Sequence, residues 1–111
     1  MDKELIGLRI ENTLKHIDLA MSNLENISKD AFEKDSMLSR AVSFSIVQIG
    51  EQLNRLETIF GKEHPGIKWN MARSMRNVLV HDYVEVDLNR VYDTLKNYLP
   101  ILKNQLSQLL A

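Results

Sequence analysis

Hydrophobic residues recur along the chain at spacings of three and four, which is the pattern of an α-helix with one buried side. The first such segment runs from about Leu5 to Ile27. Its apolar face comprises Ile10, Leu14, Ile17, Met21 and Leu24. The pattern stops at the polar residues Ser28-Lys29-Asp30, where we expect this helix to end.

The second segment, from about Asp35 to Phe60, is the longest and has hydrophobic residues on two faces. One face comprises Leu38, Val42, Ile49, Leu53, Leu56 and Phe60. The other face comprises Met37, Ala41, Phe44 and Val47. A helix that is apolar on two sides must bury both of them. The chain's own helices can cover one face. The second face indicates a partner subunit, or else this is simply the central helix of a monomeric bundle.

Gly50 and Glu51 interrupt the apolar pattern of this second segment. Glycine inside a helix costs about 1 kcal/mol relative to alanine, and close approach of another helix is the usual reason for its presence. We therefore expect a neighbouring helix to lie against Gly50. Glu51 then either holds an arginine of that helix, Arg73 or Arg76, or faces solvent.

A break separates the second segment from a third. Gly61 is typical of a helix C-cap, and the following Pro65-Gly66 prevents the helix from continuing. Beyond this break, hydrophobic residues again recur at helical spacing, so we expect a third helix from about Lys68 to His81.

The last helix is expected to begin at Asp87, whose carboxylate can cap it. Pro100 lacks a backbone N–H, so we expect it to kink this helix or to break it into two pieces. Four amphipathic helices with short connections predict an all-α, up-and-down four-helix bundle. A chain of 111 residues is long enough for one such domain, which spans residues 1–111.

Composition is ordinary for a globular protein, with 44% hydrophobic and 26% charged residues. There is no run of about 18 apolar residues and no signal-peptide pattern, so we expect a cytoplasmic protein. The chain contains no cysteine, which removes disulfides, thiolate nucleophiles and zinc thiolates. Its three histidines, at positions 16, 64 and 81, do not have metal-ligand spacing, and no metal site is expected.

The net charge of −1 gives no overall attraction to nucleic acid. Any contact with RNA must therefore use a local group of basic side chains. The candidates are Lys68, Arg73 and Arg76, all within the third helix.

The third helix ends in a cluster of chemically active side chains, namely Arg76, Asn77, His81 and Tyr83. Because an α-helix turns by about 100° per residue, Asn77 and His81 share a face, and Arg73 joins that face one turn earlier. Arg76 lies about 140° from His81 by the same count. Within one helix, the two would converge only through the long arginine side chain or a frayed last turn.

Arginine and histidine together are able to cleave RNA without a metal ion. The guanidinium group matches the oxygens of a phosphate, and imidazole can accept or donate a proton near neutral pH. The alternative is purely structural, because such residues near a helix end often cap carbonyl groups or pair with a buried carboxylate.

The spacing of Arg76-Asn77, His81 and Tyr83 resembles the signature of HEPN-domain proteins, specifically of the HepT-like toxin branch. Three further segments resemble that family in the same order: Ile46-Val47-Gln48-Ile49-Gly50-Glu51, His64-Pro65-Gly66-Ile67-Lys68-Trp69 and Val84-Glu85-Val86-Asp87. The resemblance covers roughly residues 38 to 103. Several matches in the right order are more specific than one short motif.

This resemblance implies a metal-independent endoribonuclease toxin, in which the motifs of a homodimer form one composite cleft. Arg76 would then bind and polarise a phosphate of the RNA, and His81 would transfer the proton. Asn77 would orient one of these groups or the scissile backbone, with Arg73 and Glu51 in supporting positions.

The resemblance also implies a protein partner. Related toxins pair with a minimal nucleotidyltransferase antitoxin, which uses ATP and magnesium to transfer AMP to the motif tyrosine, here Tyr83. This chain itself would need no cofactor. The alternative that stays open is a catalytically inactive HEPN module, which serves as a docking or nucleotide-binding subunit for that partner.

Overall fold

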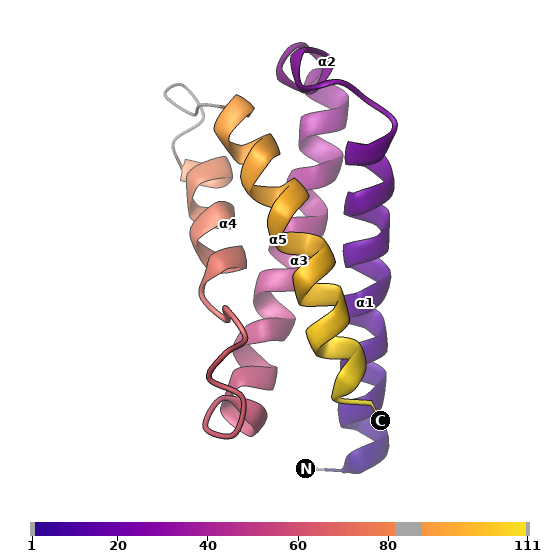
Figure 1. Ribbon diagram of the computed structural model, residues 1–111, viewed down its shortest axis with the longest axis vertical. Coiled ribbons are helices and arrows are strands. Elements are labelled where there is room, and N and C mark those ends of the chain that lie inside the picture. Colours follow the sequence, from indigo (N-terminus) through magenta and orange to yellow (C-terminus); the bar gives the residue numbers. More distant parts are fainter. Residues whose placement is uncertain (1, 82–87, 111) are drawn as a thin grey trace.

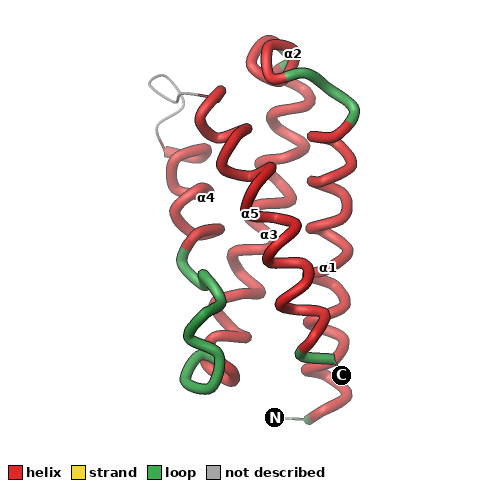
Figure 2. The backbone as a smooth tube through the Cα atoms, viewed as in Figure 1, coloured by secondary structure: helices red, strands yellow, loops and turns green. Residues whose placement is uncertain are grey.

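The computed structural model describes residues 2–81 and 88–110, without the side chains of residues 36, 76, 78–81 and 88. These described residues form five helices and no strand (Figures 1 and 2). The helices are α1 (Lys3–Glu25), α2 (Lys29–Lys34), α3 (Ser36–Phe60), α4 (Met71–His81) and α5 (Leu88–Gln108). The all-α prediction is confirmed, although the count is five helices and not four.

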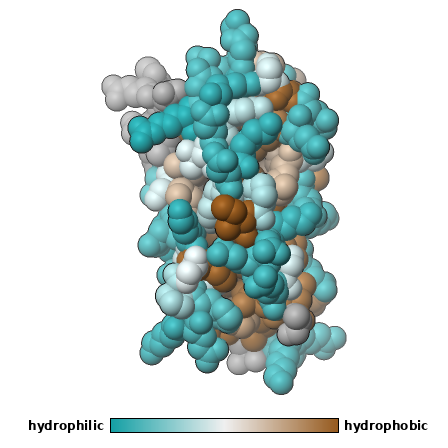
Figure 3. All heavy atoms as spheres, viewed as in Figure 1, coloured by the Kyte–Doolittle hydropathy of each residue, from teal (hydrophilic) through white to brown (hydrophobic). Residues whose placement is uncertain are grey.

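The three long helices, α1, α3 and α5, pack side by side and share one hydrophobic core (Figure 1). α4 lies on α3, on the side away from α1, and successive members of the series α1, α3, α4, α5 run in opposite directions (Figure 1). The core draws fully buried side chains from each long helix, including Ile17, Ile49 and Leu95. The face of the molecule in front of this core is mostly hydrophilic (Figure 3).

The predicted apolar face of the first helix is the face that α1 buries. Ile10, Ile17 and Leu24 are almost completely buried, and Leu14 and Met21 pack against them at the edge of the core. The helix begins one residue after Asp2, whose Oδ1 accepts a hydrogen bond from the Glu4 amide at 3.0 Å.

The short helix α2 was not expected from the sequence. Ser28, placed by the pattern at the end of the first helix, is instead the N-cap of α2, and its Oγ accepts a hydrogen bond from the Ala31 amide at 3.1 Å. Phe32 of this helix is fully buried and contacts Tyr92 of α5, with ring centroids 5.6 Å apart. A helix of six residues buries only this one side chain, so it has no apolar periodicity to detect.

α3 begins at the N-cap Asp35 and ends at the C-cap Gly61, whose amide donates to the Glu57 carbonyl at 2.8 Å. The C-cap prediction is therefore confirmed. The first predicted face of this helix, Leu38 to Phe60, is the one that faces the core. Its two end residues, Leu38 and Phe60, are half-buried. The four between them are fully buried: Val42, Ile49, Leu53 and Leu56.

Pro100 does not break the last helix. α5 continues through it from Leu88 to Gln108, so the predicted break into two pieces is wrong, whereas the alternative of a kink stays a prediction. Pro100 lies on the exposed side of α5 between the buried Leu99 and Leu102, so its ring and the unpaired carbonyl one turn earlier face solvent. The predicted N-cap, Asp87, lies outside the described residues. No helix in the described part of the chain is both long and apolar enough to span a membrane.

Candidate functional site

The helix that carries the motif rests on α3 at Gly50. A Cβ atom built on Gly50 would lie 3.7 Å from the backbone carbon of Ala72 and 3.8 Å from the amide nitrogen of Arg73. Gly50 and Ala72 are both buried. The expectation of a neighbouring helix at Gly50 is therefore confirmed, and that helix is α4.

Arg73 extends from α4 across this contact to α3. Its Nη2 is hydrogen-bonded to Oδ1 of Asn54 and lies 3.4 Å from Oε1 of Glu57. The side chains of Arg73 and Glu57 are each 38% exposed. The Nε of Arg73 is buried and has no hydrogen-bond partner among the described residues. Arg73 is thus charge-paired with Glu57 and directed toward α3.

Glu51 does not pair with Arg73 in the part of the chain that the structure describes. At about 100° per residue, Glu51 points away from Gly50, whereas Asn54 and Glu57 come back to the Gly50 side one and two turns later. Glu51 is exposed. A contact between Glu51 and Arg76 stays a prediction, because the side chain of Arg76 is outside the described residues.

The backbone of the motif is helical up to His81, the last residue of α4. Asn77 and His81 are therefore one turn apart, as the sequence predicts, and Asn77 is exposed. The side chains of Arg76 and His81 are not described, and Tyr83 lies outside the described residues. The convergence of these groups on one phosphate stays a prediction.

Two of the three predicted RNA-binding cations, Lys68 and Arg73, are not placed at the motif end of α4. Lys68 is exposed and precedes the start of α4. His81 is at the other end of this helix, and the rise from Met71 to His81 is about 15 Å. Arg73 is paired with Glu57. Arg76 is therefore the basic residue closest in sequence to the motif histidine. Among the described residues, no three acidic or histidine side chains gather in a way that could hold a metal ion.

A second apolar face of α3 lies open. Met37 is 80% exposed, Phe44 is 62% exposed, and Ala41 is also exposed. We call these three residues the exposed α3 stripe. Val47, the fourth residue of the predicted face, is half-buried.

The exposed α3 stripe lies at the same end of the molecule as the motif. α4 runs antiparallel to α3 (Figure 1), and Ala72 is beside Gly50. Moving nine residues from this crossing leads to His81 on α4 and to Ala41 on α3, in both cases a rise of about 14 Å. The motif end of α4 is therefore level with the stripe.

His16 of α1 lies beside this stripe. Its ring is 6.2 Å from the ring of Phe44, in an edge-to-face arrangement. Burial, and to a smaller extent the charge of Lys15, lowers the pKa of His16. The imidazole therefore favours its neutral form, which suits an apolar surface.

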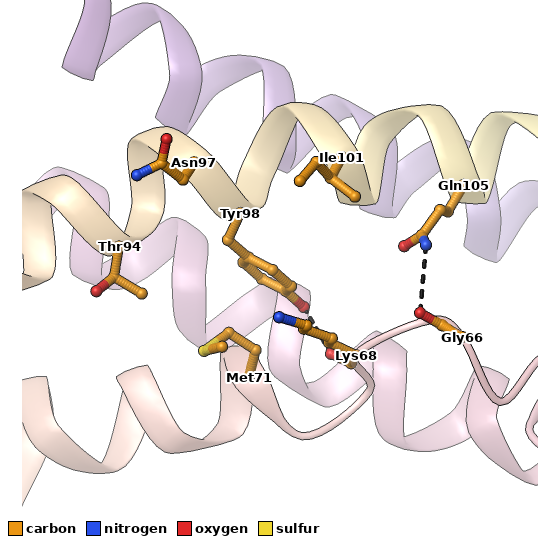
Figure 4. Close-up of a pocket in the computed structure, with 8 residues that line it drawn as sticks. All are labelled: Gly66, Lys68, Met71, Thr94, Asn97, Tyr98, Ile101 and Gln105. Carbon is orange, nitrogen blue, oxygen red and sulfur yellow. Dashed lines mark hydrogen bonds between the residues drawn. The ribbon is translucent and has the colours of Figure 1, made fainter.

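A cavity of about 410 Å³ separates α5 from the segment that leads into α4 (Figure 4). Two hydrogen bonds cross its ends, from Tyr98 Oη to the Lys68 carbonyl at 3.0 Å and from Gln105 Nε2 to the Gly66 carbonyl at 3.3 Å. Burial raises the pKa of Tyr98. This cavity was not predicted from the sequence, and it lies at the opposite end of α4 from the motif.

Comparison with known proteins assigns the chain to a family. The family model described as "Ribonuclease HepT-like" matches residues 13–109. A protein of Caldanaerobacter subterraneus subsp. tengcongensis, named "Putative RNase", is 29% identical over 101 residues, which are 91% of this chain and 90% of that protein. The "Probable ribonuclease HepT" of Thermococcus cleftensis is 27% identical over 100 residues, 86% of this chain and 91% of that protein. No solved structure matches the chain. The resemblance to the family is thus confirmed, and the chain belongs to the HepT-like ribonuclease family.

Proposed function

We propose that this protein is a metal-independent endoribonuclease toxin that cleaves RNA at a cleft shared by two copies of the chain. The observation that carries the proposal is the continuous helix through His81 in a chain of the HepT-like ribonuclease family. This helix gives Asn77 and His81 one common face, on a helix that contacts α3.

The proposed chemistry is an attack of the RNA on itself. His81 of one copy removes the proton from a 2′-hydroxyl, and the 2′-oxygen then bonds to the adjacent phosphorus. The bond from phosphorus to the 5′-oxygen breaks, and His81 of the second copy donates a proton to that leaving oxygen. Arg76 stabilises the negative charge on the phosphate oxygens. The products are a 2′,3′-cyclic phosphate and a free 5′-hydroxyl.

The proposed dimer uses the exposed α3 stripe. Large apolar side chains as exposed as Met37 and Phe44 favour contact with another apolar surface. A twofold axis near the stripe would pair each surface with its own copy, and the two α4 ends would be level with this contact along α3. A cleft shared by two copies would resolve the 140° separation of the two side chains within one helix, because Arg76 of one copy could act with His81 of the other.

The proposed regulation is AMP transfer to Tyr83 by a minimal nucleotidyltransferase antitoxin, which binds ATP and magnesium itself. Tyr83 is two residues after His81 in the sequence. An adenylyl group there would add bulk and a negative phosphate beside the cleft, and both would oppose RNA binding. Mass spectrometry after incubation with such a partner and ATP tests this step, and AMP found only on other residues would contradict it.

The decisive test of the activity is cleavage of a generic RNA or tRNA by purified protein in EDTA, with analysis of the product ends. We expect 2′,3′-cyclic phosphate ends, and a loss of about 10²–10⁴ in rate for His81→Ala. His64→Gln is the matched control, since this histidine lies in the loop after α3, and it should retain activity. Cleavage that persists in His81→Ala would reject the assignment. An inactive wild-type protein would favour the catalytically inactive docking module.

A further inference from the structure

Two small residues form the crossing between α3 and α4. Gly50 and Ala72 meet there, with backbone atoms of α4 at 3.7–3.8 Å from the position of a Gly50 Cβ. Small residues let two helices come close, but they offer no large side chain that interlocks with the facing helix. The crossing therefore leaves the rotation and the axial position of α4 to be fixed by other contacts.

The described part of α4 is held by a small number of side chains: Ala72 is buried in the core, and Met71 and Met75 pack against it. This helix has 11 residues, and helices shorter than about 12–15 residues are marginal in isolation. Where α4 begins, the cavity of about 410 Å³ separates it from α5 (Figure 4). Tyr98 of α5 is hydrogen-bonded to the backbone of Ala72 at the start of α4 and to the Lys68 carbonyl just before it, and Gln105 is hydrogen-bonded to the Gly66 carbonyl.

Arg73 supplies a further restraint, a polar contact from α4 to α3. Its Nη2 reaches both Asn54 and Glu57, which lie one turn apart on α3. A planar guanidinium group satisfies two acceptors only over a narrow range of positions, unlike the ammonium group of lysine. The two contacts therefore restrict both how far α4 is rotated and where it sits along α3.

We propose that Arg73 is a positioning residue, which acts through Asn54 and Glu57 to set the placement of the motif on α4. Arg76 and His81 follow three and eight residues later on the same helix, so a rotation at Arg73 is transmitted to both. The positive charge of Arg73 then pairs with Glu57, and the Arg73 side chain does not contact the RNA phosphate. The catalytic part of this inference rests on the proposed ribonuclease function, whereas the part about the helix does not.

Glu57→Gln separates the two roles of Arg73, because they predict opposite results. If Arg73 is a positioning residue, the variant loosens α4, and kcat falls roughly ten- to a hundredfold while KM changes little. If Arg73 is a phosphate contact, the variant frees its charge and RNA binding becomes tighter. Glu63→Gln, in the loop after α3, is the matched control and should leave both constants unchanged.

Arg73→Lys gives a second distinction, since it keeps the charge and removes the planar guanidinium group. A positioning role predicts a similar loss of kcat, with no change in how KM depends on salt. A phosphate contact predicts nearly normal activity in the lysine variant. In Arg73→Ala it predicts a weaker salt dependence, by about one unit of slope. The second pattern would overturn the proposal.

Amide hydrogen exchange tests the helix placement without reference to RNA. In Glu57→Gln we expect faster exchange at the amides of residues 75–81 and unchanged exchange in the buried parts of α1 and α5. Unchanged exchange in α4 would overturn the positioning role, even if the enzyme is active. If the wild-type protein cleaves no RNA, the proposed function fails, and the exchange measurement still decides the role of Arg73.

Discussion

Gly50 and Arg73 differ in how much of their role the sequence could predict. A glycine inside an apolar helix implies that another helix packs closely against it, whichever part of the chain that helix comes from. The contact at Gly50 was therefore predictable. The partner of Arg73 depends on the register of α4 against α3. Periodicity within each helix does not determine that register. From the sequence alone, Arg73 could have contacted any of three polar residues of α3, namely Glu51, Asn54 and Glu57. Only the packed structure selects Glu57.

Gly50→Ala should stabilise the protein. The added methyl group meets Ala72 and Arg73 at 3.7–3.8 Å, which is ordinary van der Waals contact. The substitution removes the cost of glycine inside a helix, about 0.5–1 kcal/mol in the free energy of unfolding. Urea denaturation of the variant and the wild type measures this gain.

Gly7→Ala in α1 is the matched control for this prediction, because no atom lies within 4 Å of the new methyl group. It should show the gain in helix propensity alone, so the two variants should be stabilised by similar amounts. A Gly50→Ala variant less stable than the wild type would mean that α3 and α4 approach more closely than described.

At the scale of the elements, the sequence predicted those helices that are long enough to show a repeating apolar pattern. α1 and α3 each repeat an apolar face over several turns, and that face is buried as expected. α2 was missed because a single buried residue, Phe32, has no period. The break at Pro100 was wrong for a different reason. The cost of proline in a helix depends on what surrounds it, and Pro100 lies where solvent can satisfy the freed carbonyl.

Phe32→Ala should show that α2 is an integral part of the fold. Phe32 is fully buried against Tyr92, and truncation of a buried phenylalanine costs about 3–5 kcal/mol in the free energy of unfolding. Thermal or urea denaturation would measure the loss. Ser28→Ala, which removes only the N-cap, should cost about 1 kcal/mol. Equal, small effects of both substitutions would indicate that α2 detaches without consequence for the core.

At the scale of the whole molecule, the second apolar face of α3 is the feature whose meaning depends on another molecule. The sequence left open a partner subunit or the central helix of a monomeric bundle. The structure shows that the chain's own helices leave Met37, Ala41 and Phe44 exposed, so the explanation by burial within one chain does not hold for these residues. The proposed homodimer accounts for them, and it also provides the second motif that the catalytic proposal requires.

Phe44→Glu should therefore convert the proposed dimer into a monomer and abolish RNA cleavage. The new carboxylate would lie in the apolar contact, where burial of an unpaired charge is strongly unfavourable. Ile101→Glu in α5 is the matched control. The two side chains are similarly exposed, 60% for Ile101 and 62% for Phe44, but Ile101 lies outside the stripe. Light scattering at micromolar concentration and RNA cleavage are measured on both variants, with circular dichroism to confirm that each is folded. If Phe44→Glu stays dimeric, the dimer uses a different surface. If it is monomeric and still cleaves RNA, one motif is sufficient and the shared cleft is wrong.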